Sequence, residues 1–416
     1  MGEAGWNSLF ALGMNHRTAP VELREKIALP PQARVEVRKA LLSEDRVAGS
    51  VLLSTCNRTE LYGCHGERGG SKDSLLELLH PLILPAVNAS RHAYVHWGWD
   101  SVFHLFRVAA GLDSMVVGES EILRQVKLAQ DEAHSAGQAN RLLQDLFRQA
   151  VELGKKVRRE THLGDGSLSV AATAVKLAHK IVGALKGRKA LVVGAGETGR
   201  LTAKHLLASG VEDLMLLNRT PERAEEVADE LGCRHGTLDD LEAAIDEAEV
   251  IMSAVEAKEF VIRPEHFKGR RRRRRCVIDI SMPRSVDPSC AQGSEVFLFD
   301  LDDLGGLVEQ ARRARQGSVR EAEALLLNEV RKFLSRQSYV EISPIVNELR
   351  GSWHGVVEEG LDRLPLDAKG RSDVERLVKK IMGMGLDALK RSQRQRFGMD
   401  EIQAAYEAYL KRIGEA

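Results

Sequence analysis

The order of apolar and polar positions predicts that strands and helices alternate at the start of the chain. Residues 8–14 (SLFALGM), 51–53 (VLL) and 61–64 (LYGC) are short apolar runs of strand length. Residues 100–109 carry apolar side chains at helical spacing, and Asp100 is a candidate N-cap. This mixture predicts an α+β first domain.

A second alternating region follows residue 163. The apolar run 190–193 (ALVV) precedes the glycine-rich segment 194–199 (GAGETG), and a helical pattern comes directly after it. A glycine-rich turn between a strand and a helix is typical of dinucleotide-binding units. The later apolar runs of this region are 214–217, 250–255, 277–281 and 296–299. We therefore expect a doubly wound parallel sheet of the Rossmann type.

From residue 302 onward the apolar spacing is helical, with a dense charged face. A long helix with a few short ones has too little core to stand alone, so we expect its apolar stripe to form a homodimer interface. The prediction is a multi-domain α/β protein: an α+β domain at 1–162, a Rossmann-type domain at 163–301, and a long linker helix with a C-terminal helical domain at 302–416.

Composition narrows the class of protein. The 416 residues are 43% hydrophobic and 29% charged, as in ordinary globular proteins. The 60 basic residues balance the 60 acidic ones, so the net charge does not indicate a nucleic-acid partner. The five cysteines include no CxxC pair, which argues against a disulfide framework or a zinc site and fits a reducing cytoplasm. We expect no metal, no signal peptide and no membrane span. The run Arg270–Arg275 is interpreted as a solvated loop, with contact to RNA phosphates as the alternative.

The first candidate site is Cys56, which directly follows a predicted buried strand. Its neighbours Thr55, Asn57 and Arg58 are polar. A nearby guanidinium favours the thiolate, which is the nucleophilic form of cysteine. The alternative is a small cysteine of the core, because free cysteines are often buried.

The second candidate site is the glycine-rich segment and the end of the next predicted strand. An NAD enzyme usually places an acidic residue at that strand end to bind the ribose hydroxyls. Here Asn218 and Arg219 occupy it, and a guanidinium suits a 2′-phosphate, so we expect NADPH. The alternative is that Arg219 only caps an exposed turn. The residues predicted to bind the cofactor are Gly194, Ala195, Gly196, Glu197, Thr198, Gly199, Asn218, Arg219 and Thr220.

Several longer stretches together resemble glutamyl-tRNA reductases. They are MNHRTAPVELREK, LLSTCNRTELY, HLFRVAAGLDSMVVGESEILRQVK, VVGAGETGR, NRTPERAEEVA and VIDISMPRSVDP. The resemblance implies that Cys56 is the nucleophile and that His104 is linked to activity. By itself, a single histidine among apolar helix positions, as His104 is, is more often a core or surface residue than a catalyst. The resemblance further implies a glutamyl pocket lined by Thr55, Asn57, Arg58, Ser114, Glu119, Ser120, Glu121 and Gln125. On their own, the polar residues after 113 fit helix capping equally well.

The resemblance implies that NADPH reduces glutamyl-tRNA(Glu) to glutamate-1-semialdehyde, the first step of tetrapyrrole biosynthesis. Cys56 would form a thioester, Arg58 would hold a substrate carboxylate, and His104 would protonate the leaving hydroxyl or assist Cys56. The first and second domains are expected to close on one another. Expected partners are the tRNA substrate, a second copy of the chain, and the downstream glutamate-1-semialdehyde aminomutase.

Two other functions fit parts of the sequence. The segment NRTPERAEEVA also resembles shikimate dehydrogenases, so an NADP-dependent alcohol dehydrogenase is one alternative. It would need no nucleophilic cysteine. The other alternative is a non-catalytic tRNA-binding protein, which would bind charged tRNA without oxidising NADPH.

Overall fold

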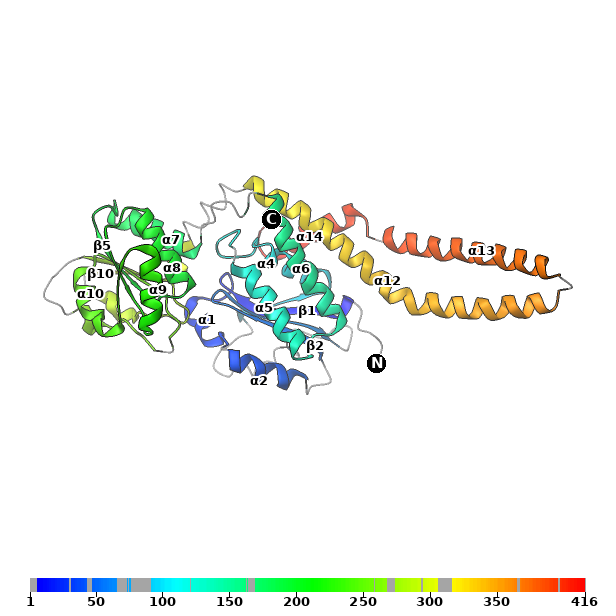
Figure 1. The fold of residues 1–416 in the computed structure, drawn as a ribbon, viewed down its shortest axis with the longest axis horizontal. Coiled ribbons are helices and arrows are strands. Elements are labelled where there is room, and N and C mark those ends of the chain that lie inside the picture. The colour runs from blue at the N-terminus through cyan, green and yellow to red at the C-terminus, as the bar shows by residue number, and fades with distance from the viewer. Residues whose placement is uncertain are drawn as a thin grey trace.

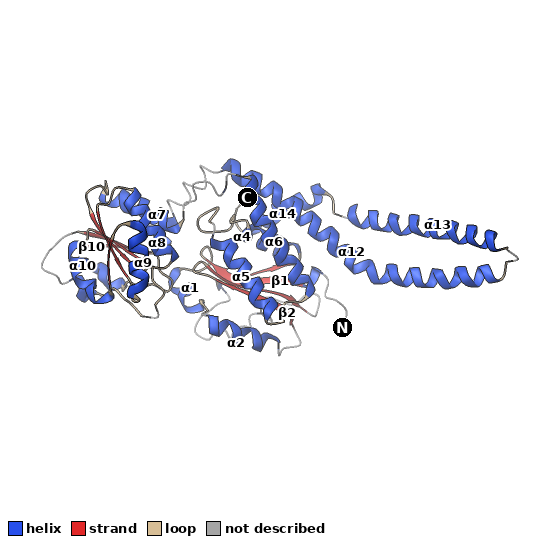
Figure 2. Cartoon of the chain, in the orientation of Figure 1, coloured by secondary structure: helices blue, strands red, loops and turns tan. Residues whose placement is uncertain are grey.

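The computed structural model describes residues 6–29, 31–42, 47–65, 73, 75, 91–119, 121–161, 163, 169–257, 259–267, 274–292, 295–305, 316–364, 367–395 and 397–415. Three parts follow one another along the longest axis (Figure 1). A green domain lies at one end, a blue and cyan domain lies in the middle, and a helical hairpin projects at the other end. Strands occur in the first two parts, whereas the projecting part is helical (Figure 2).

The middle domain contains an antiparallel sheet of order β2-β3-β1-β4. Its strands are β1 (Leu9–Asn15), β2 (Val47–Ser54), β3 (Arg58–His65) and β4 (Tyr94–Trp97). Successive side chains of a strand point to opposite faces. Leu9 and Ala11 accordingly join one hydrophobic cluster, whereas Phe10 and Leu12 join another. Both faces of the sheet are therefore covered.

The helices of this domain form the two covering layers. They are α1 (Val21–Ile27), α2 (Pro31–Leu42), α4 (Trp99–Ala109), α5 (Glu121–Ser135) and α6 (Arg141–Glu160). The cluster around Leu9 contains Phe103 of α4 and Leu146 of α6. The cluster around Phe10 contains Ile27 of α1 and Val37 of α2. The predicted α+β domain is present.

The green domain is built on a six-stranded parallel sheet of order β10-β9-β8-β5-β6-β7. Its strands are β5 (Lys189–Val193), β6 (Asp213–Leu217), β7 (Arg234–Gly236), β8 (Val250–Ser253), β9 (Arg275–Asp279) and β10 (Val296–Phe299). Its α-helices are α7 (Val170–Val182), α8 (Glu197–Ala208), α9 (Pro221–Leu231) and α10 (Leu241–Glu247). The strand order reverses between β5 and β8, which is where ligands bind in doubly wound sheets. The Rossmann-type prediction is confirmed.

Arg275 differs from the expectation for the arginine run. It begins β9 and is almost fully buried, and its Nε donates to the Ile245 carbonyl oxygen at 3.0 Å. Its guanidinium also pairs with Asp246 at 3.2 Å. Arg275 therefore belongs to the core of the Rossmann-type domain rather than to a solvated loop, and residues 270–273 lie outside the described residues.

The remaining helices are α12 (Gln316–Asp362), α13 (Ala368–Gln395) and α14 (Met399–Arg412). The predicted long helix and C-terminal helices are present. Phe333 of α12 and Tyr409 of α14 belong to the same hydrophobic cluster as Phe103 of α4. The beginning of α12 and all of α14 thus pack on the middle domain, and the rest of α12 runs out beside α13 (Figure 1).

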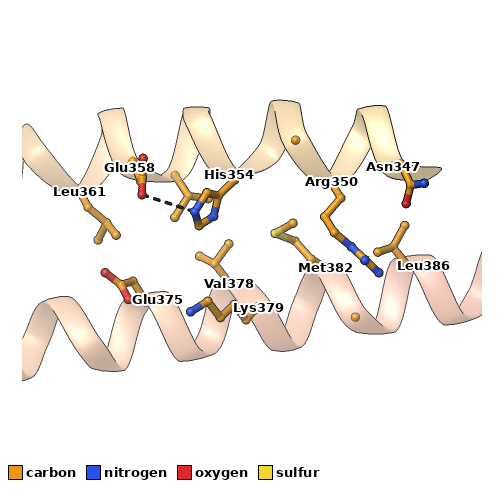
Figure 3. A pocket seen from close by; sticks show the side chains of 13 residues that line it. Asn347, Arg350, His354, Glu358, Leu361, Glu375, Val378, Lys379, Met382 and Leu386 are labelled. Atoms are coloured by element: carbon orange, nitrogen blue, oxygen red, sulfur yellow. Dashed lines mark ion pairs between the residues drawn. The ribbon is translucent and has the colours of Figure 1, made fainter. Parts of the chain in front are cut away.

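A cavity of about 660 Å³ lies between α12 and α13 in the projecting hairpin. His354 and Glu358 of α12 pair across one helical turn at 3.4 Å, and Val378 and Met382 of α13 face them (Figure 3). None of the predicted catalytic or cofactor-binding residues lines this cavity.

The first two domains are joined by packing and by ion pairs. Met115, in the segment after α4, belongs to the hydrophobic cluster of the Rossmann-type domain. Arg284 Nε donates to Glu25 Oε1 of α1 at 2.9 Å, and Arg24 of α1 pairs with Asp302. Among the described residues, no helix is long and apolar enough to cross a membrane. The same residues contain no group of three or more His, Cys, Asp or Glu placed to hold a metal ion.

Candidate active site between the first two domains

Cys56 lies in the three-residue connection between β2 and β3. The Thr55 amide donates to the Arg58 carbonyl oxygen at 2.8 Å, which closes the turn. The Thr55 hydroxyl oxygen accepts the amides of Asn57 at 3.1 Å and Arg58 at 3.2 Å. Hydroxyl side chains stabilise tight turns in this way. Thr55 therefore shapes the turn that presents the half-buried Cys56.

Arg24 is a functional residue that the sequence reasoning missed. Its buried guanidinium donates from Nη1 to the Cys56 carbonyl oxygen at 3.2 Å and to Asn57 Oδ1 at 3.0 Å. Asn57 is itself buried, so its side chain holds the turn. The sequence carried no local signal for this contact, because Arg24 lies in a different element more than thirty positions away.

The ionisation of Cys56 differs from the prediction. Burial, and then the Glu119 carboxylate, raise the pKa of the thiol to about 12, and Arg24 acts in the opposite direction. The expected thiolate beside Arg58 is therefore wrong for this arrangement: the thiol is protonated at neutral pH. Attack by Cys56 thus requires a base that removes its proton.

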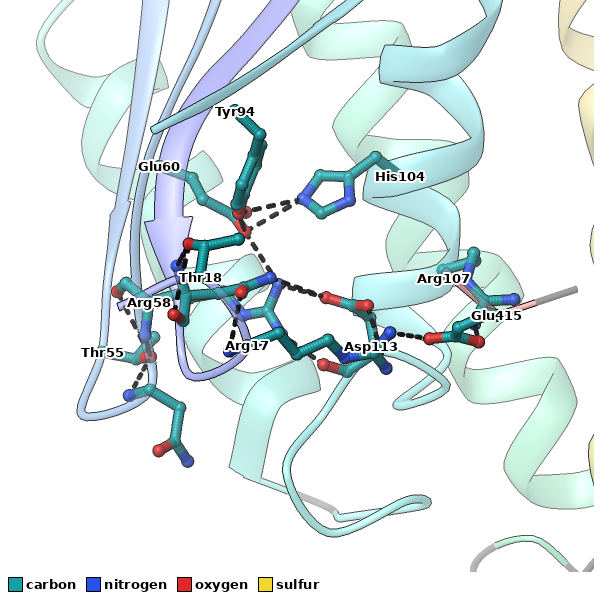
Figure 4. Close-up of polar contacts among 12 residues, drawn as sticks. Arg17, Thr18, Thr55, Arg58, Glu60, Tyr94, His104, Arg107, Asp113 and Glu415 are labelled. Carbon is teal, nitrogen blue, oxygen red and sulfur yellow. Dashed lines mark hydrogen bonds and ion pairs between the residues drawn. The ribbon is translucent and has the colours of Figure 1, made fainter. Parts of the chain in front are cut away.

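The guanidinium of Arg58 is fully buried in a network of charges (Figure 4). Its Nη1 donates to Glu60 Oε1 at 2.7 Å and to Asp113 Oδ2 at 2.9 Å, and Nη2 donates to the Asp113 carbonyl oxygen at 2.6 Å. Burial alone would lower the pKa of Arg58, but Glu60 and Asp113 raise it well above its usual range. This differs from the expectation of a guanidinium free to hold a substrate carboxylate, because within the described part of the chain Nε is the one nitrogen of this guanidinium without a hydrogen-bond partner.

His104 does not line the cavity that contains Cys56. Its Nε2 lies 3.0 Å from Glu60 Oε1, and its Nδ1 lies 3.1 Å from the Tyr409 hydroxyl. Burial alone would raise the pKa of Glu60, but Arg58 and His104 hold it below its usual range. Glu60 is therefore ionised and accepts the Nε2 proton. The expectation that His104 protonates the leaving hydroxyl or assists Cys56 is not supported, because both ring nitrogens are occupied away from the cavity.

The other residues of the predicted glutamyl pocket differ in where they lie. Glu119, Glu121 and Gln125 line the cavity together with Thr55 and Cys56. Ser114 is buried, and its hydroxyl has no hydrogen-bond partner. Ser120 lies outside the described residues. The pKa of Glu119 is raised to about 7, mainly by burial and then by Glu121.

This cavity, of about 1370 Å³, lies between the first two domains. Cys56, Glu119 and Gln125 line it from the middle domain. The residues that line it from the Rossmann-type domain include Glu197, Thr198, Leu201, Arg219, Ala254 and Val255. The predicted nucleophile and the predicted cofactor segment therefore face the same space.

The glycine-rich segment is built to bring backbone close to a ligand. Gly194 has φ +111°, and a Cβ there would lie 2.3 Å from the Ala254 carbonyl oxygen. A Cβ on Gly199 would lie 1.8 Å from the Gly194 carbonyl oxygen. At Gly196, the N-cap of α8, a Cβ would meet no atom within 4 Å. Two glycines thus serve internal packing, and the third leaves room in front of the first amides of the helix.

The end of β6 supports the predicted preference for a phosphorylated cofactor. The Asn218 side chain accepts from the Ala195 amide at 3.2 Å and donates to the Thr220 carbonyl oxygen at 3.0 Å, so it connects this strand end to the glycine-rich segment. Arg219 is exposed at the cavity and forms no ion pair with the residues that the structure describes. A free guanidinium at this position fits a 2′-phosphate.

Comparison with known proteins places this geometry in a family. The family model "Glutamyl-tRNAGlu reductase, N-terminal domain" matches residues 12–161. The glutamyl-tRNA reductase of Desulfitobacterium hafniense is 37% identical over 385 residues, which are 89% of this chain and 86% of that protein. The one from Rubrobacter xylanophilus is 40% identical over 378 residues, covering 89% and 88%. The chain belongs to the glutamyl-tRNA reductase family.

Two further similarities concern other parts of the chain and its whole length. The model "Shikimate / quinate 5-dehydrogenase" matches residues 176–307, which is the Rossmann-type domain alone. A solved structure of the glutamyl-tRNA reductase from Methanopyrus kandleri is 32% identical, covers 97% of this chain and 98% of its own, and has a TM-score of 0.47. The shikimate-type alternative was therefore wrong as a reading of the whole chain, because the Cys56 turn lies outside that match.

Proposed function

We propose that this member of the family reduces the glutamyl ester of tRNA to glutamate-1-semialdehyde through a thioester on Cys56. The observation that carries the proposal is that Cys56 lines the same cavity as Thr198 and Arg219 of the predicted cofactor site. An acyl group bound to sulfur would thus lie in the space that the dinucleotide site opens into. A plain alcohol dehydrogenase would have no use for this cysteine.

Glu119 is the group we assign to proton transfer. It lines the cavity with Cys56, and its carboxyl has a pKa of about 7, raised by burial and by Glu121. A group with a pKa near the working pH serves both as base and as acid. Glu119 takes the thiol proton as sulfur attacks the ester carbon, and returns it to the ribose oxygen as that bond breaks. The products are a glutamyl thioester and free tRNA.

The glutamyl group is assigned to the part of the cavity lined by Thr55, Glu119 and Gln125. Arg58 donates its amide to the Thr55 hydroxyl but does not itself line the cavity. Arg58 keeps its ion pairs with Asp113 and Glu60, which fix its orientation. We propose His104 as a positioning residue for Glu60.

The residues of the second domain fit NADPH. Gly196 leaves the backbone open to a pyrophosphate, and the Arg219 guanidinium, which forms no ion pair with the described residues, suits a 2′-phosphate. When bound, NADPH supplies the hydride that converts the thioester carbonyl to the aldehyde. Met115 and the α1 ion pairs hold the two domains together around the cavity.

A homodimer through the projecting hairpin is the oligomeric state we propose. Large apolar side chains on α12 and α13 are exposed: Ile345, Val356, Leu377, Ile381, Met384 and Leu389. Exposed apolar patches of this kind mark interfaces. Sedimentation should show a dimer, and a Val356→Asp variant should sediment as a monomer. An interaction with the aminomutase remains a prediction from the resemblance.

The experiment that tests the function is NADPH oxidation with glutamyl-tRNA against free glutamate. Glutamyl-tRNA should support oxidation and free glutamate should not, because only the ester has a leaving group for Cys56. Cys56→Ser should abolish the reaction, and Cys233→Ser, a half-buried thiol of the Rossmann-type domain, is the matched control. A fully active Cys56→Ser variant would remove the thioester from the mechanism. Binding of charged tRNA without any NADPH oxidation would favour the non-catalytic alternative.

A further inference from the structure

The segment formed by α14 and Glu415 packs against the domain that carries Cys56. Tyr406 and Tyr409 of α14 are buried, and both rings contact Phe103 of α4, with ring centroids 5.2 and 5.8 Å apart. Arg412 Nη2 pairs with Asp100 at the start of α4 at 2.6 Å. Residues some three hundred positions apart thus form one core, and polar groups of α14 reach the charge network beneath the Cys56 turn.

The first connection runs through Tyr409. Its hydroxyl lies 3.1 Å from His104 Nδ1, and the ionised Glu60 accepts the proton on Nε2 at 3.0 Å. The contact at Nδ1 lies on the opposite side of the ring from the contact at Nε2, so the Tyr409 hydroxyl and Glu60 together fix the orientation of His104. Glu60 Oε1 in turn accepts from Arg58 Nη1 at 2.7 Å. The path therefore ends on the guanidinium next to the turn.

The second connection runs through Glu415. Its carboxylate pairs with Arg17 and with the buried Arg107 (Figure 4). Arg17 Nη2 lies 3.4 Å from Asp113 Oδ1, and the other oxygen of that carboxylate accepts from Arg58 Nη1 at 2.9 Å. Burial alone would raise the pKa of Asp113, but Arg58 and Arg17 hold it well below its usual range. Asp113 therefore remains charged and connects the two arginines.

Both connections end on the same atom, Arg58 Nη1. We propose that Tyr409 and Glu415 are positioning residues of the reductase. Tyr409 acts through His104 and Glu60, and Glu415 acts through Arg17 and Asp113. Together they hold the Arg58 side chain in a fixed orientation beside the Cys56 turn. The inference rests on the proposed function, because Arg58 donates its amide to the Thr55 hydroxyl and Thr55 lines the part of the cavity assigned to the glutamyl group. It assigns to α14 and Glu415 a part in substrate binding in addition to packing.

The chemistry of the contacts favours this role over packing alone. A buried ion pair contributes little net stability compared with apolar residues of similar volume, since its charges lose their hydration. Apolar packing already attaches α14 through Ile402, Tyr406 and the ring of Tyr409. The Glu415 carboxylate and the Tyr409 hydroxyl add ion pairs and a hydrogen bond to this apolar packing. Both sets of contacts lead to Arg58.

The first test is Tyr409→Phe, with Tyr406→Phe as its matched control. Both variants remove one buried hydroxyl from α14 and keep the ring, but Tyr406 bonds to Arg107 and Glu323 and not to His104. Tyr409→Phe should raise the KM for glutamyl-tRNA by roughly three- to tenfold, the effect of one buried hydrogen bond. The KM for NADPH should stay unchanged. Tyr406→Phe should leave both KM values within about twofold at a similar melting temperature.

The second test is Glu415→Gln, with Glu407→Gln on the exposed face of α14 as control. Glu415→Gln should again raise the KM for glutamyl-tRNA and not that for NADPH, measured at a temperature where circular dichroism shows the variant folded. Equal KM values for glutamyl-tRNA in Tyr409→Phe and Tyr406→Phe would overturn the inference, as would parallel losses toward both substrates. Absence of a thioester on wild-type Cys56 would instead contradict the proposed function, so the two failures are distinguishable.

Discussion

The two segments that face one another across the cavity are fixed in opposite ways. The Cys56 turn is held by side chains: the Thr55 hydroxyl accepts the Asn57 amide, and the buried Arg24 guanidinium donates to the Cys56 carbonyl oxygen and to Asn57 Oδ1. The glycine-rich segment is held by the absence of side chains, since Gly194 touches the backbone after β8 directly. The acyl-binding side thus depends on charges and hydrogen bonds, and the cofactor side depends on shape.

Substitution of the glycines should have the largest effect of the changes considered, and it should act on the cofactor site. In Gly194→Ala a Cβ would lie 2.3 Å from the Ala254 carbonyl oxygen at φ +111°, so we expect lost activity and destabilisation of about 3 kcal/mol or more. Gly196→Ala should fold normally, because a Cβ there meets nothing within 4 Å, yet weaken NADPH binding. Thermal melting and NADPH titration measure the two effects. Normal NADPH binding by Gly196→Ala would contradict the assignment of the open position to the cofactor.

Replacement of Glu119 should impair thioester formation on Cys56, because it removes the proposed base. As the base for Cys56, Glu119 must be deprotonated, so kcat/KM should rise with pH through about 7, where its raised pKa lies. Glu119→Gln should remove this rise and reduce kcat/KM on the order of 100-fold. Glu121→Gln is the sharper control. Because Glu121 raises the pKa of Glu119, its loss should move the midpoint to lower pH while activity persists. An unchanged pH profile in Glu119→Gln would exclude Glu119 as the base.

Removal of Arg24 should impair thioester formation on Cys56, because the turn loses a side chain that holds it in place. Arg24→Ala removes the donors to Cys56 and Asn57 and leaves Asp302 without its partner. Misplacing a reacting atom by about 1 Å costs on the order of 100-fold in rate, and we expect a loss of that size in thioester formation. NADPH affinity should change little, since Arg24 does not line the cavity. Equal losses in thioester formation and in NADPH affinity would show that the Cys56 turn and the cofactor site are not independent.

Arg219 should give the smallest effect and test the choice of cofactor. Arg219→Ala should raise the KM for NADPH about tenfold and leave that for NADH unchanged, because only NADPH carries the 2′-phosphate. Arg223→Ala, an exposed arginine two positions into α9, is the matched control. Equal use of NADPH and NADH by the wild type would contradict the assignment of Arg219.

These two sides also differ in how far they could be predicted. The strand, the glycine-rich turn and the helix are adjacent in sequence, so the segment from Gly194 to Gly199 predicted the Rossmann-type fold of this domain correctly. The position of Cys56 after an apolar run was likewise a local pattern. The ionisation of its thiol depends on Glu119, the orientation of Arg58 on Asp113, and the orientation of His104 on Tyr409. Such contacts between distant residues leave no periodic pattern, and for this reason Arg24, Tyr409 and Glu415 were missed.

The central claim is that Cys56 carries the glutamyl group, and mass spectrometry tests it most directly. The protein is mixed with glutamyl-tRNA without NADPH, quenched in acid and digested. The account predicts a glutamyl adduct on the peptide containing Cys56 that disappears when NADPH is added before quenching, with release of the semialdehyde. NADPH oxidation that proceeds while Cys56 remains unmodified in every sample would contradict it.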